Sequence, residues 1–308
     1  MNRIFVATSN FSVNSNQPLT LLEKHGLNIN LNPLNCKLTT DDLIQYASDS
    51  SGIIAGTELY TPRVFEHLKD LKVISRLGVG IDNIDLDVAH ENGVEVFRTK
   101  TTPASAVAEL ALGLMLDVAR KVTYQHNQLA SGTWKKEMGN LLQGKTLGII
   151  GLGTIGKTLV ELVRGFKFKV LAHDLSHDKA FQKENNITYC DLDTLLKQSD
   201  IISIHLNLTD KTQNLINEER IALMNPEAIL INASRGGIVD EKALYNALKN
   251  ERILGSGLDV FNKEPYDGPL IKLNNVVLTP HVGSYAKEMR IQMEIEAAEN
   301  LIKGLQNE

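Results

Sequence analysis

The chain has 308 residues, of which 43% are hydrophobic, so it is long enough for two domains that each bury a core. Its 32 basic and 37 acidic side chains leave a net charge of -5, so no overall positive field attracts nucleic acid or a membrane surface. We therefore expect its partners to be small molecules and a second copy of the chain, as a homodimer or a tetramer.

Two further features indicate a cytoplasmic protein. Cys36 and Cys190 lie far apart without metal-ligand spacing, which is typical of a reducing compartment and gives no reason to expect a metal. The longest apolar stretch, residues 110–116, is bounded by Glu109 and Asp117 and is well short of the roughly 20 residues that cross a bilayer. The apolar run 4–7 is too short for a signal-peptide core and predicts a strand.

Short β-rich runs alternate with helical patterns over the first hundred residues, which predicts a first parallel α/β unit. The predicted strands are residues 4–7, 27–30, 52–55, 73–76 and 94–98. Thr102 suits an N-cap and Pro103 a first helical position, so we expect a long helix from there toward His126. Because this helix is apolar on most of its circumference, we expect it to pack between domains or between subunits.

A second alternating set follows and predicts a second parallel unit. Its strands are expected at residues 146–150, 168–172, 200–205, 228–232, 257–260 and 276–279. A final helix at 287–305 is expected to pack back onto the first unit.

The segment 146–156 reads Thr-Leu-Gly-Ile-Ile-Gly-Leu-Gly-Thr-Ile-Gly, a strand followed by a glycine turn and a helix, which is typical of dinucleotide binding. Gly151 allows a tight turn, Gly153 lets the backbone approach a pyrophosphate, and Gly156 lets the helix pack on the strand. The alternative is an ordinary glycine turn, but the amphipathic helix that follows favours the nucleotide. Asp174 lies at the spacing where a carboxylate accepts ribose hydroxyls and repels a 2'-phosphate, which favours NAD over NADP.

Three more segments that can carry chemistry lie at the ends of predicted strands, where an open parallel sheet meets its ligands. They are residues 232–237, 257–265 and 279–283, and they contain Arg235, Glu264 and His281. Taken singly, each of these side chains is more often structural. Their joint occurrence after the nucleotide segment favours a catalytic role.

With these segments in place, the chain resembles the D-isomer-specific 2-hydroxyacid dehydrogenases over essentially its whole length. The resemblance includes Arg-Leu-Gly-Val-Gly-Ile-Asp-Asn-Ile-Asp at 76–85, Val-Ala-Glu at 107–109, Trp134, Gly-Lys-Thr at 144–146 and the three strand-end segments in order. It implies two Rossmann-like, doubly wound α/β domains with the active site in the cleft between them. Residues 1–98 plus 284–308 would form a flavodoxin-like substrate domain, and 99–283 an inserted NAD-binding domain.

The family pattern also implies a role for each side chain. Arg235 would bind the substrate carboxylate bidentately and polarise the adjacent carbonyl, which a lysine could not do. His281 would exchange the proton as general acid and base, and Glu264 would orient the imidazole and stabilise its charged form. The hydride would travel on NAD.

Cofactor and substrate contacts are expected at the glycine turn and the strand ends. The expected cofactor contacts are Gly151, Gly153, Thr154, Ile155, Gly156, Asp174, His205, Ala233, Arg235, Asp259 and His281. The expected substrate contacts are Arg76, Gly78, Val79, Gly80, Arg235 and His281. For Asp259 and His205, a purely structural role is the alternative, and Trp134 is expected to pack at a subunit contact.

Several motifs look most like 3-phosphoglycerate dehydrogenase, the first enzyme of phosphorylated serine biosynthesis, which makes 3-phosphoglycerate the expected substrate. A glyoxylate or hydroxypyruvate reductase is the alternative within the family, because Ala-Gly-Thr-Glu at 55–58 stands where phosphoglycerate enzymes usually carry an arginine. Glu264, where formate dehydrogenases use glutamine, argues against formate. A non-enzymatic, NAD-sensing corepressor-like protein is the alternative outside catalysis.

Overall fold

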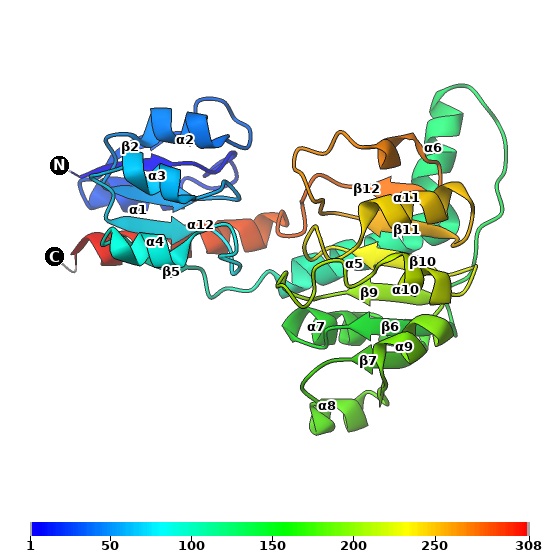
Figure 1. Ribbon diagram of the computed structural model, residues 1–308. Coiled ribbons are helices and arrows are strands. Elements are labelled where there is room, and N and C mark those ends of the chain that lie inside the picture. Colours follow the sequence, from blue (N-terminus) through cyan, green and yellow to red (C-terminus); the bar gives the residue numbers. More distant parts are fainter. Residues whose placement is uncertain (1, 307–308) are drawn as a thin grey trace. The chain divides into compact units, whose positions relative to one another are not determined.

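The computed structural model describes residues 2–306, which divide into two compact units. The first unit contains the residues up to Thr102 and those from Tyr285 onward, and the second contains Pro103–Ser284. Each unit is built on one parallel sheet, of five and seven strands respectively, flanked by helices (Figure 1). This confirms the α/β class and the two parallel sheets. The cleft between the units stays a prediction.

The sheet of the first unit has the strand order β2-β1-β3-β4-β5. Its strands are β1 (Arg3–Val6), β2 (Asn28–Leu31), β3 (Gly52–Ala55), β4 (Val73–Arg76) and β5 (Glu95–Arg98). Its helices are α1 (Gln17–Lys24), α2 (Thr40–Ala47), α3 (Pro62–His67), α4 (Leu86–Glu91) and α12 (Lys287–Gln306). The helices α2, α3 and α4 bury one core and α1 and α12 another, so apolar side chains cover both faces of the sheet.

The last helix returns to the first unit, as the sequence predicts. α12 contacts α1, β3, β4 and β5, although it follows the second unit in the chain (Figure 1). Met293 and Leu301 on this helix are at most 1% exposed. The apolar stripe of α12 therefore completes the core of the first unit.

The second sheet has the order β12-β11-β10-β9-β6-β7-β8. Its strands are β6 (Thr146–Ile150), β7 (Lys169–His173), β8 (Thr188–Tyr189), β9 (Ile201–Ile204), β10 (Ile229–Asn232), β11 (Gly255–Leu258) and β12 (Val276–Leu278). Its helices are α5 (Ala104–Arg120), α6 (Val122–Ala130), α7 (Thr154–Leu162), α8 (Lys179–Glu184), α9 (Leu192–Gln198), α10 (Glu218–Leu223) and α11 (Glu241–Lys249). From β6 the chain adds β7 and β8 on one side of the sheet, and it then adds β9, β10, β11 and β12 in turn on the other side. Ligands of such sheets bind at the carboxyl ends of the strands beside this reversal.

The expected long helix near residue 103 is present, but its two ends differ from the expectation. Pro103, not Thr102, is the N-cap, and the helix breaks at Lys121, whose φ of 53° and ψ of 41° are left-handed. Within its own unit α5 packs against α7, β10 and β11, and a contact with another domain or subunit stays a prediction. A Cβ added at Gly257 of β11 would lie 2.8 Å from Cβ of Leu114, so glycines in that strand let the helix approach closely.

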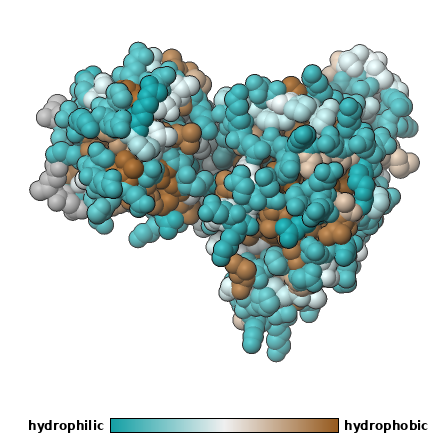
Figure 2. All heavy atoms as spheres, viewed as in Figure 1, coloured by the Kyte–Doolittle hydropathy of each residue, from teal (hydrophilic) through white to brown (hydrophobic). Residues whose placement is uncertain are grey.

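Other differences are small. Strand ends differ from the predicted ones by at most two residues, and the two-residue edge strand β8 is too short to produce a sequence signal. Among the helices of the described residues, none is long and apolar enough to cross a bilayer. On the face drawn in Figure 2, hydrophilic side chains predominate on both units.

Candidate active site

The glycine turn between β6 and α7 has the shape that a dinucleotide requires. Gly151 has a φ of +94°, and a Cβ added there would lie 2.4 Å from the carbonyl oxygen of His205. A Cβ at Gly156 would lie 2.5 Å from the carbonyl oxygen of Gly151, whereas one at Gly153 would meet open space. No side chain caps the N-terminus of α7, which begins with Thr154 and Ile155. The turn therefore fits the pyrophosphate of NAD at the helix N-terminus.

Asp174 follows β7 and lies beside this turn. Its Oδ2 accepts a hydrogen bond from the Leu152 backbone N–H at 2.7 Å, and its Oδ1 accepts one from Ser176 N–H at 2.8 Å. The backbone thus fixes the carboxylate against the glycine turn. An acid in this position fits the ribose of NAD and disfavours the extra phosphate of NADP.

His205 follows β9 on the other side of the turn. Its Nε2 lies 2.9 Å from Oγ of Ser203, and its Nδ1 is buried with no hydrogen-bond partner among the described residues. Burial lowers the pKa of His205 to about 4, so the ring is neutral at neutral pH. A role in contacting the cofactor stays a prediction.

The loop that carries Arg235 is held by Asn232, the last residue of β10. Asn232 Oδ1 accepts hydrogen bonds from the backbone N–H and the hydroxyl of Ser234, at 3.1 and 2.8 Å, and its Nδ2 donates to the Arg235 carbonyl at 2.9 Å. A Cβ added at Gly236 would lie only 2.0 Å from the carbonyl oxygen of Phe261, so this loop packs directly on the loop after β11. Sequence reasoning missed Asn232, although an asparagine at a strand end is a common turn signal. Ala233, between them, is 7% exposed.

His281 and Glu264 form a direct pair. Nδ1 of His281 lies 3.1 Å from Oε1 and 3.0 Å from Oε2 of Glu264. The His281 side chain is 33% exposed and that of Glu264 is 17% exposed, so the pair is reachable but largely sheltered from water. Because a carboxylate occupies one ring nitrogen, the imidazole has a fixed orientation and its other nitrogen can exchange a proton.

Asp259 holds the loop around His281. Its Oδ1 accepts from the Thr279 hydroxyl at 2.6 Å and from Val282 N–H at 2.8 Å, and its Oδ2 accepts from Gly283 N–H at 2.8 Å. Asp259 is 1% exposed, and burial raises the pKa of its carboxyl group. The backbone of His281 is left-handed, with a φ of 56°, so these bonds stabilise a conformation that histidine seldom adopts. The structure thus gives Asp259 a structural role, and contact with the nicotinamide stays a prediction.

Among the expected substrate contacts, Arg76 is the last residue of β4 in the first unit, and Gly78, Val79 and Gly80 lie in the loop that follows it. Arg76 is 9% exposed, donates to the Leu77 carbonyl, and packs so closely on Gly78 that a Cβ there would lie 2.6 Å from Nη1. Val79 is 37% exposed, and Gly80 is half-buried. The loop 76–80 is therefore at the carboxyl end of its sheet. Its approach to Arg235 and His281 stays a prediction.

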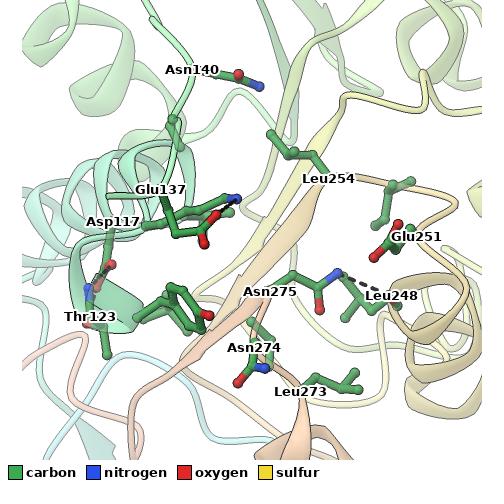
Figure 3. Close-up of a pocket in the computed structure, with 18 of the residues that line it drawn as sticks. Asp117, Thr123, Glu137, Asn140, Leu248, Glu251, Leu254, Leu273, Asn274 and Asn275 are labelled. Atoms are coloured by element: carbon green, nitrogen blue, oxygen red, sulfur yellow. Dashed lines mark hydrogen bonds and ion pairs between the residues drawn. The ribbon is translucent and has the colours of Figure 1, made fainter. Parts of the chain in front are cut away.

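A pocket of about 650 Å³ lies elsewhere in the second unit (Figure 3). It is lined by the end of α5, the segment around Glu137, and the residues before β11 and β12, including Leu254 and Asn275. Its lining includes neither the glycine turn nor Arg235, Glu264 or His281. This pocket is at the amino ends of β11 and β12, away from the strand ends that carry the candidate catalytic residues.

Comparisons with known proteins agree with this geometry. Residues 112–283 match the family "D-isomer specific 2-hydroxyacid dehydrogenase, NAD binding domain". The chain is 42% identical over 256 residues to a glyoxylate reductase of Thermococcus litoralis, covering 80% of this chain and 77% of that protein. It is 40% identical over 259 residues to a hydroxypyruvate reductase of Thermotoga maritima, covering 82% of this chain and 84% of that one.

A third relative has the name of the enzyme that the sequence motifs resemble most. The chain is 40% identical over 277 residues to a D-3-phosphoglycerate dehydrogenase of Methanocaldococcus jannaschii, covering 88% of this chain but 53% of that protein. Among solved structures, the TT0316 protein of Thermus thermophilus is similar with a TM-score of 0.88 and 34% identity, covering 99% of this chain and 97% of that one. The fold is thus shared over 99% of this chain, and the match to the NAD-binding domain covers residues 112–283.

Proposed function

Because the chain belongs to the D-isomer-specific 2-hydroxyacid dehydrogenase family, we propose that it interconverts a small 2-oxo acid and its D-2-hydroxy acid at Arg235, Glu264 and His281. The observation that carries this proposal is the His281–Glu264 pair, with both carboxylate oxygens within 3.1 Å of Nδ1, in the same unit as the dinucleotide turn. We assign the NAD-binding role to the second unit and the substrate role to the first.

His281 is the proton carrier in this proposal. During reduction, the protonated imidazole donates to the carbonyl oxygen of the substrate, and during oxidation it accepts the hydroxyl proton. Glu264 stabilises the positive ring and fixes which nitrogen faces the substrate. The αL loop conformation held by Asp259 sets where that nitrogen points.

Arg235 binds the substrate carboxylate. A guanidinium presents two parallel N–H groups, so it can orient an α-carboxylate and place the neighbouring carbonyl carbon in one position. Asn232 and the close contact between Gly236 and Phe261 support this loop. The chain therefore positions the substrate by a rigid strand-end loop rather than by a flexible side chain alone.

The glycine turn after β6 and the N-terminus of α7 would hold the pyrophosphate of NAD, and Asp174 would hold its ribose. When bound, the nicotinamide supplies the hydride acceptor or donor for the reaction. Gly153 offers the open approach that the phosphates need, and Asp174 is already oriented by Leu152 and Ser176.

We propose glyoxylate or hydroxypyruvate as the substrate, with 3-phosphoglycerate as the second candidate. Glu58 is 2% exposed and its carboxylate accepts from Gly56 N–H at 2.7 Å. Burial raises the pKa of Glu58, while Arg76 and Lys37 favour its charged form. Because Glu58 offsets the charge of Arg76, this edge of the first unit favours a monocarboxylate over a doubly charged phosphoryl group. The motifs shared with 3-phosphoglycerate dehydrogenase support the second candidate, which would place the protein in serine biosynthesis.

A homodimer is the assembly that we propose, and the cytoplasm the location. The segment from α6 to residue 141 exposes several large apolar side chains, which is typical of a protein contact. They are Val122, Leu129, Trp134, Met138 and Leu141. The strong exposure of Trp134, at 82%, supports a partner contact there. Both cysteines are free, as in a reducing compartment.

The test is a substrate panel. Purified protein is assayed for NADH consumption with glyoxylate and hydroxypyruvate, and for NADH formation with D-glycerate and 3-phosphoglycerate. We expect the highest kcat/KM with one of the unphosphorylated acids. A preference for 3-phosphoglycerate would instead support the second candidate, and no turnover of any 2-oxo or 2-hydroxy acid would refute the proposal.

A further inference from the structure

The loop 261–264, which follows β11 and carries Glu264, is held at three points. Glu241 Oε1 accepts a hydrogen bond from Asn262 N–H at 2.5 Å, and Glu264 Oε1 accepts from Phe261 N–H at 3.3 Å. On the other side, the Phe261 carbonyl packs against Gly236. One of the three restraints on this loop therefore comes from an acid that the proposed mechanism does not use.

Glu241 is not needed to start its own helix. It is the first residue of α11, but the N-cap of that helix is Asp240, whose Oδ1 accepts from the N–H groups of Lys242 and Ala243. The carboxylate of Glu241 is directed instead to the loop after β11, which is 21 residues away in sequence. This contact joins the start of α11 to the loop of the candidate catalytic acid.

The charges around Glu241 are mostly negative. Its half-buried carboxyl group has a raised pKa, first because of burial and further because of Asp240 and Glu264, while the Asn262 N–H opposes the rise. Tyr266, which stacks on Phe261 at 4.3 Å between ring centroids, also interacts electrostatically with Glu241. A half-buried acid near two other acids is costly, and such a cost is typical of a functional arrangement.

We propose that Glu241 is a positioning residue, which holds Asn262 so that both oxygens of Glu264 face Nδ1 of His281. The inference rests on the proposed function for the role of His281. The restraint on the loop is a separate claim that can be measured without substrate.

The experiment uses a matched set of three variants of the full chain. Glu241→Gln keeps an oxygen that can accept from Asn262 but removes the charge, and Glu241→Ala removes both. Asp240→Ala is the control, because it removes the cap of the same helix without touching the loop 261–264. Hydrogen exchange of the Asn262 amide measures the restraint, and kcat and KM with NADH and the best 2-oxo acid measure its effect on turnover.

For Glu241→Ala, we expect exchange of the Asn262 amide to be at least about tenfold faster and kcat to fall about tenfold, with KM for NADH within about twofold of the parent. Glu241→Gln should retain the amide protection and most of kcat. Asp240→Ala should lower the melting temperature and leave the exchange of the Asn262 amide close to that of the parent.

Two results would overturn the inference. One is parental exchange of the Asn262 amide in Glu241→Ala, because the loop would then not depend on Glu241. The other is a kcat loss in Glu241→Ala that is no greater than that of Asp240→Ala, or one that Glu241→Gln does not rescue, which would leave only a structural effect. If the parent turned over no 2-oxo acid but the exchange differences appeared, the proposed function would fail while the restraint stood.

Discussion

The carboxyl ends of the two sheets are organised in different ways. In the second unit, Asn232, Asp259 and Glu264 each interact with two or more hydrogen-bonding groups, so the loops that carry Arg235 and His281 are held from several sides. In the first unit, Arg76 and Lys37 favour the charged form of buried Glu58. The buried hydroxyl of Tyr60 has no hydrogen-bond partner among the described residues. We therefore expect the restrained loops of the second unit to serve the chemistry, and the charged edge of the first unit to serve the choice of substrate.

The largest expected effect on this contrast comes from replacing His281, the proposed proton carrier in the second unit. His281→Asn tolerates the left-handed backbone but cannot exchange a proton, so we expect kcat to fall about a thousandfold. NADH affinity and the melting temperature should change little, as measured by fluorescence titration and thermal unfolding. A kcat within about tenfold of the parent would show that His281 is not the acid and base.

Arg235→Lys tests whether the guanidinium of Arg235 binds the substrate carboxylate through two parallel hydrogen bonds. One ammonium cannot reproduce two parallel hydrogen bonds, so kcat/KM for glyoxylate should fall about 30-fold, which corresponds to about 2 kcal/mol. The charge is retained, so a purely electrostatic role would leave kcat/KM nearly unchanged. Steady-state kinetics at matched NADH saturation distinguishes the two.

Burial of His205 in the second unit makes the stability of the fold depend on pH. Its pKa is lowered from 6.5 to about 4 in the folded chain, so between these values the unfolded chain binds more protons. Stability therefore rises with pH through this window and is lost on acidification from pH 6.5 toward 4, by up to about 3 kcal/mol. Urea unfolding at several pH values should show a shallower acid loss in His205→Gln. Parallel curves for the variant and the parent would contradict the burial of a neutral ring.

Glu58→Gln gives the smallest expected effect and tests the first unit. Removing this charge leaves Arg76 less compensated, so the ratio of kcat/KM for 3-phosphoglycerate to that for D-glycerate should rise about three- to fivefold. The matched control is Glu66→Gln, an exposed acid on α3. An unchanged ratio in Glu58→Gln would show that this acid does not take part in the choice of substrate.

Much of the fold was predictable because parallel α/β units leave strong local signals. Buried strands read as short Val- and Ile-rich runs, and the dinucleotide turn needs glycines at fixed positions, of which Gly151 and Gly156 meet backbone atoms in the structure. The break at Lys121 was not predictable, because a left-handed lysine leaves no mark in an otherwise continuous helical pattern. The packing of α5 within its own unit depended on glycines of a strand more than a hundred residues away.

The candidate site, too, could be predicted only in part from the sequence. Arg235, Glu264 and His281 were identified from motifs at strand ends, and the direct His281–Glu264 pair agrees with the predicted pairing. The supporting bonds of Asn232 and Glu241 join residues to loops that only the fold brings together. A sequence pattern identifies residues by type and spacing, whereas the hydrogen bonds that orient them depend on side-chain geometry.

The most direct test of the central claim is kcat for 2-oxo acid reduction in the parent and in Glu264→Gln. A glutamine can still hydrogen-bond Nδ1 of His281 but carries no charge to stabilise the positive ring. We expect kcat to fall at least about a hundredfold, with the affinity for NADH within about twofold of the parent. A kcat within about threefold of the parent would contradict the claim that the His281–Glu264 pair carries the proton.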